Sequence, residues 1–205
     1  MTRSLFLTSR RAAAVALALA LAVVAFSASC GKSMMQQGNG SSYLIVDSLQ
    51  AAPGVSPGTL STMLASDVVT VKAGVPTLFS DPGQAVMHVA MKDTSSGVTP
   101  TETNTITITG YHVDYVRSDG GTSVPASFDG ALTATVTTTA TTVPFTLVNA
   151  QAKGVAPLAA LASPSSEHIL VVAHVTFFGH DQAGHTVTVA TTISINFADW
   201  LDPAA

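Results

Sequence analysis

The sequence predicts an all-β fold, a single antiparallel β-sandwich of about eight strands, because apolar residues recur at every second position and turn residues separate the runs. The clearest run covers residues 185–197. One of its faces carries Val187, Val189, Thr191, Ile193, Ile195 and Phe197. The other face carries small or polar residues. This alternation is typical of an antiparallel strand with one buried face.

The run before it predicts the partner strand of a hairpin. Residues 168–178 place Ile169, Val171, Ala173, Val175 and Phe177 on one face. The connection between the two runs is Gly179-His180-Asp181-Gln182-Ala183-Gly184. Asp early and Gly late in a connection favour a type I turn closed by a residue in the left-handed conformation. We therefore expect the two runs to pair, with both apolar faces in the core.

Six further segments have strand composition or the same period: 43–49, 67–72, 84–92, 104–117, 130–138 and 142–149. Within 104–117 the apolar positions change parity at Gly110, which predicts a β-bulge. Only 58–65 and 157–162 are expected to form a helical turn or two. Trp200 is expected to close the end of the sandwich. No internal repeat is present, so residues 43–205 are predicted to form one domain.

Residues 1–29 have the layout of a secretory signal peptide. Arg3, Arg10 and Arg11 precede an uninterrupted apolar run of 15 residues, Ala12 to Phe26, and the small residues Ser27-Ala28-Ser29 follow. As a helix this run would reach about 22 Å, short of the ~30 Å hydrocarbon core of a bilayer. A permanent membrane-spanning helix is therefore disfavoured.

Cys30, the only cysteine, follows directly after these small residues. An unpaired cysteine in an exported protein calls for an explanation. Its position resembles the lipobox of bacterial lipoproteins, in which the cysteine is acylated and becomes the first mature residue, although Ser27 stands where the family usually has Leu. Ordinary cleavage and an uncleaved anchor are the alternatives. Residues 30–42 are predicted to be the lipidated cysteine and a flexible tether.

Several segments of the predicted domain resemble a group of bacterial envelope lipoproteins of unassigned activity with immunoglobulin-like or fibronectin-III-like sandwiches. The resemblance rests on Ser66–Thr70, on Gly110–Gly120, on Val175–Gly184 and on the terminal Phe197-Ala198-Asp199. It implies an immunoglobulin-like fold and a place in the cell envelope. It implies no activity and no catalytic residues.

Three residues around the predicted hairpin turn are candidate metal ligands: His180, Asp181 and His185. Imidazole and carboxylate together suit Zn or Cu. The alternative interpretation is that Asp181 is there because Asp forms turns. A Ca²⁺ site would need Asp199 and Asp202 to approach Asp181, which depends on the strand ends meeting.

The sequence has no recognisable catalytic motif, neither a Gly-x-Ser-x-Gly elbow nor a His-Glu-x-x-His helix. Loss of residues 1–29 would remove three of the eight basic residues and none of the twelve acidic ones, leaving a net charge of −7. This argues against nucleic-acid binding. We expect no cofactor and no enzymatic activity. The expected role is a non-catalytic interaction or structural module.

The expected partners follow from the anchor. One is the membrane, reached through the lipid on Cys30, and another is a protein of the envelope. Gly31 rather than Asp follows the cysteine. By resemblance to lipoproteins of two-membrane bacteria, this favours the outer membrane, and otherwise the outer face of the cytoplasmic membrane. A metal-binding envelope protein is the alternative function.

Overall fold

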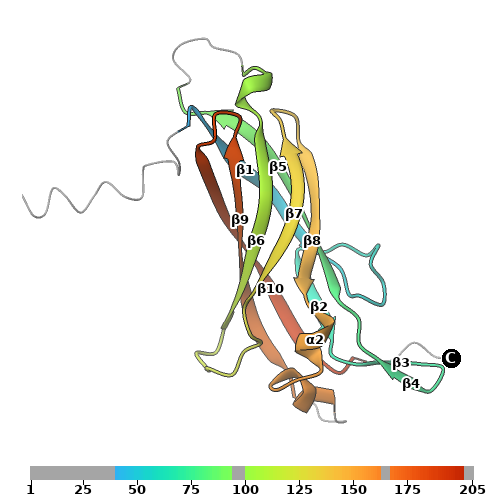
Figure 1. The fold of residues 1–205 in the computed structure, drawn as a ribbon. Helices are drawn as coiled ribbons and strands as arrows, with labels where there is room; N and C mark the ends of the chain where they lie inside the picture. The colour runs from blue at the N-terminus through green and yellow to red at the C-terminus, as the bar shows by residue number, and fades with distance from the viewer. Residues whose placement is uncertain (1–39, 94–99, 163–166, 201–205) are drawn as a thin grey trace, which may run out of the picture. The chain divides into compact units, whose positions relative to one another are not determined.

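Two β-sheets build most of the computed structural model, which describes residues 40–93, 100–162 and 167–200 (Figure 1). A three-stranded sheet has the order β1-β5-β8, and a five-stranded sheet has the order β2-β10-β9-β6-β7. The signal peptide predicted at 1–29, Cys30 and Asp202 lie outside the described residues. The strands of the two sheets are β1 (Ser42–Ala51), β2 (Met63–Asp67), β5 (Asp81–Met91), β6 (Ile106–Arg117), β7 (Phe128–Val136), β8 (Thr141–Val148), β9 (Ile169–Asp181) and β10 (Thr186–Ala198).

The all-β prediction is confirmed, but the prediction of a purely antiparallel arrangement is wrong. Strand β2 pairs in parallel with β10, with Ile195 opposite Leu64. Every other pairing between the strands listed above is antiparallel. The mixed sheet curls into a half-barrel, so the arrangement is not a clear immunoglobulin-like sandwich. The parallel pairing was not predicted, because most of β2 lies within 58–65, which the sequence predicts to be helical.

The segment between β1 and β5 differs most from the prediction. Residues 58–65, expected to be helical, form turns and then β2. The strand predicted at 67–72 is divided between the end of β2 and a separate strand, β3 (Thr70–Lys72). This strand pairs with β4 (Val75–Thr77) in a small hairpin whose tip holds Ala73 and Gly74 at φ 51° and 79°. No strand is predicted at β4, because it contains Pro76. Proline cannot donate a hydrogen bond to a strand ladder and is tolerated only at sheet edges or bulges.

Helical structure is as scarce in the described residues as the sequence predicts. The short helix expected at 157–162 is confirmed as the 3₁₀ helix η2 (Leu158–Ala162). A second one, η1, covers Glu102–Asn104. The four-residue helix α2 (Ala150–Lys153) was not predicted. Its start has a recognisable cause, because the side chain of Asn149 accepts a hydrogen bond from the backbone N–H of Gln151.

The core lies between the two sheets, and the predicted inward faces of β9 and β10 supply much of it. On β9 the buried residues alternate strictly with exposed or half-buried ones. On β10, Ile193, Ile195 and Phe197 are buried as predicted, whereas Val189 is only partly covered. The shift predicted at Gly110 is confirmed, because the register of β6 changes between Ile108 and Gly110 against both neighbours.

Aromatic rings join the sheets. The Phe145 ring from the three-stranded sheet lies 5.2 Å from Tyr111 and 5.2 Å from Phe177, both in the five-stranded sheet. Both contacts are edge-on, the arrangement that the ring quadrupole favours. Gly83 is needed beneath this cluster, since a Cβ there would lie 2.5 Å from the Phe145 ring.

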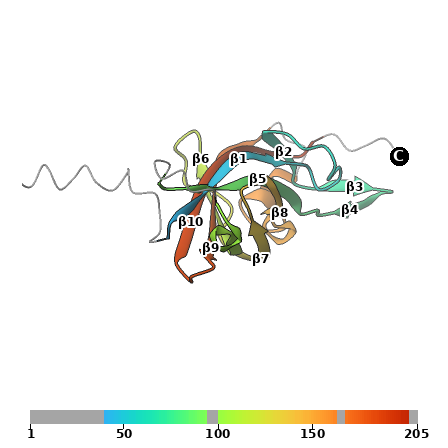
Figure 2. The ribbon, with the colours of Figure 1, turned by 90° about the horizontal axis from the view of Figure 1, so that it is seen from above.

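Gly40, where the chain enters the β-domain, and the β3–β4 hairpin lie at opposite ends of β1. Gly40 lies against the β9–β10 turn, where an added Cβ would be 2.4 Å from the Asp181 carboxylate. Ten residues of β1 then span roughly 33 Å. Beyond its far end, the β3–β4 hairpin extends away from the two sheets (Figure 2).

Candidate functional site

The residues proposed as metal ligands form a hydrogen-bonded turn between β9 and β10. One carboxylate oxygen of Asp181 accepts hydrogen bonds from the backbone N–H groups of Ala183 (2.9 Å) and His185 (2.8 Å). The other oxygen lies 2.8 Å from His185 Nδ1. Gly184, at φ 85°, closes the turn as predicted. Asp181 therefore organises the backbone of this turn.

The electrostatics of Asp181 agree with this structural role. Its burial opposes ionisation, but the hydrogen bonds from His185 and from the backbone amides outweigh that effect and lower the pKa of Asp181. The ring of His180 does not point at this carboxylate in the hydrogen bond that it makes, in which Nδ1 lies 3.2 Å from the backbone carbonyl oxygen of Asp181. Among the described residues, no three His, Cys, Asp or Glu side chains are grouped so as to hold a metal ion.

Asp181 and Asp199 are too far apart to bind one Ca²⁺ ion. Asp181 ends β9 at the turn, whereas Asp199 follows the last residue of β10. The 13 residues of β10 separate the two carboxylates by roughly 40 Å. The strand ends that this site required to meet are at opposite ends of the sheet.

Two other histidines lie in strands, as the sequence predicts, and each contacts an aspartate. His88 Nδ1 is 2.8 Å from Asp47 Oδ2, and His112 Nδ1 is 2.7 Å from Asp129 Oδ1. All four side chains are substantially exposed to solvent. Exposed pairs of this kind contribute little to stability.

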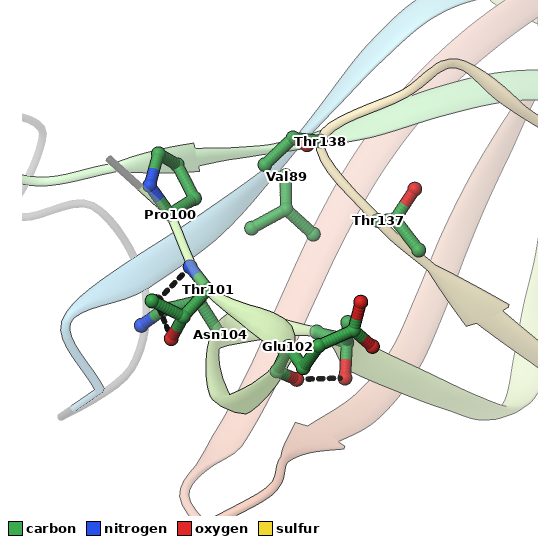
Figure 3. Close-up of a pocket in the computed structure, with 8 residues that line it drawn as sticks. Val89, Pro100, Thr101, Glu102, Asn104, Thr137 and Thr138 are labelled. Carbon is green, nitrogen blue, oxygen red and sulfur yellow. Dashed lines mark hydrogen bonds between the residues drawn. The ribbon is translucent and has the colours of Figure 1, made fainter.

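A small cavity lies between η1 and the β7–β8 turn (Figure 3). Its volume is about 100 Å³, and the side chain of Glu102 extends towards Thr137. The amide oxygen of Asn104 is already bonded to the backbone and the hydroxyl of Thr101. Pockets that bind small molecules are usually ~300–1,000 Å³, so this cavity is too small for one.

A larger cavity, of about 480 Å³, is lined by residues that include Arg117, Leu161 and His168. The guanidinium group of Arg117 is already paired, because it donates hydrogen bonds to both carboxylate oxygens of Asp119 at 2.6 and 2.8 Å. These hydrogen bonds lower the pKa of Asp119. No nucleophile paired with a base is found among its described lining residues.

A buried ion pair that we did not predict from the sequence lies at the far end of β1. Lys153 Nζ is 2.9 Å from Asp81 Oδ1, and the two side chains are 1% and 0% exposed. Asp81 also accepts hydrogen bonds from Ser66 Oγ (2.6 Å) and from the backbone N–H of Gly54 (2.8 Å). Burial raises the pKa of Asp81, against the lowering effects of Lys153 and of these hydrogen bonds.

Apolar side chains are exposed around this same end, which we call the apolar end. It combines the loop at 53–61, the β3–β4 hairpin with the residues after it, and the residues that follow α2. These segments adjoin one another, because a Cβ added at Gly54 would lie 2.5 Å from Phe79 and one added at Gly154 would lie 3.2 Å from Leu78. The exposed apolar residues are Val55, Leu60, Val71, Val75, Leu78 and Val155, and Val75 has the largest exposed fraction, 61%.

Trp200 lies against an edge strand and does not close the sandwich as expected. It remains 39% exposed. Its indole N–H donates a hydrogen bond to the backbone carbonyl of Ser66 at 3.2 Å. The expectation failed because β2 already occupies the sheet edge beside the end of β10.

No protein-family model, curated protein or solved structure matches this chain. In the part of the chain that the structure describes, no helix is long and apolar enough to cross a membrane.

Proposed function

We propose that this chain is a lipid-anchored protein of the bacterial cell envelope, and that its β-domain is a non-catalytic interaction or structural module. The observation that carries the proposal is the apolar end. Six apolar side chains are exposed there, and clusters of exposed apolar residues are typical of interaction sites. The predicted signal peptide and the position of Cys30 support export and lipidation.

The position of the apolar end fits a tethered module. The chain enters the domain beside the Asp181 turn, roughly 33 Å of β1 away from the apolar end. A lipid on Cys30 would therefore be connected to one end of the domain and leave the other end available to a partner. The partner that fits is an envelope protein with an apolar contact surface.

The finer fold that we propose is a variant of the immunoglobulin-like sandwich. The order β1-β5-β8 corresponds to strands A, B and E of that fold, and β10-β9-β6 corresponds to G, F and C. Strand β7, beside β6, takes the place of the additional strand of the variable type. Sandwiches of this kind have many functions, so the fold supports a module without specifying its partner.

Replacement of Cys30 tests the anchor. We expect Cys30→Ser to move the protein from the membrane fraction to the soluble fraction or to leave an uncleaved precursor, because no thiol remains to be acylated. Two acyl chains hold a protein firmly at a membrane, whereas one gives only marginal binding. Fractionation and immunoblotting measure the change. Unchanged membrane association with normal processing would contradict lipidation.

A photoreactive residue at Val75 tests the interaction module in living cells. We expect it to cross-link to an envelope protein, because Val75 is the most exposed of the six apolar side chains of the apolar end. Thr133, exposed on β7 away from this end, is the matched control. Gel shifts identify the products. Identical cross-linking from both positions, or none from Val75, would contradict an interface at the apolar end.

Metal binding is the second candidate, favoured by the grouping of His180, Asp181 and His185 at one turn. Elemental analysis of the purified protein distinguishes it from the first. Stoichiometric Zn, Cu or Ca that is lost in His185→Ala would favour metal binding. A stable protein without metal would favour the interaction module.

A further inference from the structure

Lys153 and Asp81 bring an amine and a carboxyl group together out of contact with water. They are separated by 72 residues in the sequence, and Nζ lies 2.9 Å from Oδ1. Their side chains are 1% and 0% exposed. Lysine is almost never buried to this extent unless it is paired, and here both members of the pair are shielded from water.

We propose that Lys153 and Asp81 condense to form an intramolecular amide, which cross-links α2 to the start of β5. The Lys153 nitrogen forms a bond to Cγ of Asp81, and the bond from Cγ to one carboxyl oxygen breaks. That oxygen leaves as water with two protons, both supplied in net by the Lys153 ammonium group. The charges of ammonium and carboxylate cancel, so the step needs no other reactant.

The neighbouring groups are placed to assist each part of this step. The backbone N–H of Gly54 donates to Oδ1 at 2.8 Å and polarises the carboxyl group. The hydroxyl of Ser66 donates to Oδ2 at 2.6 Å, where it can pass a proton to the leaving oxygen. Lys153 Nζ also donates to the backbone carbonyl of Asp67 at 2.8 Å, which holds the nitrogen beside the carboxyl group. Positioning of this kind corresponds to effective concentrations of ~10⁵–10⁸ M in well-oriented reactions.

The surroundings also favour the product. An ion pair in a dry interior bears a desolvation cost, and condensation replaces both charges by a neutral amide. The raised pKa of Asp81 agrees with this, since it favours the proton transfer from Lys153 that yields a nucleophilic amine. The water released is excluded from a site whose side chains have almost no exposed surface, and this disfavours hydrolysis.

Mass spectrometry of the full-length protein after digestion at lysine tests the proposal. Cleavage after each lysine would release residues 73–92, which contain Asp81, and separate 93–153 from 154–205. The amide blocks cleavage at Lys153. We therefore expect 73–92 to be joined to an uncut 93–205, with a mass lower than the sum of the two by one water molecule.

Two variants control this measurement. Lys153→Arg keeps the positive charge but has no nucleophilic amine, so the branched product should disappear. Lys72→Arg, at an exposed lysine of β3, should retain the cross-link, which then joins 33–92 to 93–205 because cleavage after residue 72 is lost. Should Lys153→Arg fail to fold, the native protein alone decides. Recovery of 73–92 as a free peptide, with complete cleavage after Lys153, would overturn the proposal.

Discussion

Replacing Asp81 with alanine is expected to lower the free energy of unfolding by about 3–5 kcal/mol, the usual cost of removing one partner from a buried ion pair. The variant leaves the ammonium group of Lys153 in the interior without its carboxylate partner, hydrogen-bonded to the backbone carbonyl of Asp67. It also deprives Ser66 and Gly54 of their hydrogen-bond acceptor. Urea unfolding of the purified protein measures the change.

The control for Asp81 is Asp129, which also pairs with a basic side chain. The Asp129 side chain is 84% exposed, so Asp129→Ala should change stability by less than about 1 kcal/mol.

For Asp81→Ala, a loss near 5 kcal/mol would approach the whole stability of a small domain, which is typically ~5–15 kcal/mol. If Asp81→Ala did not fold, Ser66→Ala should still show a loss of about 1.5–3 kcal/mol. Equal, mild effects at Asp81 and Asp129 would contradict the buried network.

Replacing Ile193 with alanine should lower the free energy of unfolding by about 2–5 kcal/mol, because it leaves a cavity in the core. Ile193 is 3% exposed on the inner face of β10. Its neighbour Thr192 is exposed on the outer face, so Thr192→Ala should be nearly neutral. Thermal and urea unfolding of both variants provide the comparison.

This pair of variants tests the register of β10. A shift by one residue exchanges the two faces of a strand. Reversal of the two effects would therefore mean that the strand is misplaced by one position. Two equally mild effects would mean that β10 does not contribute one face to the core.

The strands with strong alternation could be predicted almost completely. Strands β9 and β10, their hairpin and the parity change at Gly110 follow from side-chain period and turn chemistry, both of which are local. Val189 is on the predicted inner face of β10, but it is only partly buried. How far a strand residue is covered depends on what lies above it, which the period cannot specify.

The candidate site was less predictable. Grouping in the sequence correctly placed Asp181 and His185 at one turn, and their contact is local, four residues apart. The Lys153–Asp81 pair joins residues far apart in the chain. Its signals were weak, a lysine in an otherwise apolar and small-residue segment and an aspartate directly before Pro82.

The all-β class, the faces of the long strands and the turn at Asp181 could be predicted, because they depend on interactions between residues close in the chain. The parallel pairing of β2 with β10, the burial of Lys153 beside Asp81 and the exposure of the apolar end became evident only in the folded chain. Each of these depends on which segments meet after the chain has crossed between sheets. A sequence pattern reports the environment that a residue prefers, whereas packing of distant segments decides which partner it meets.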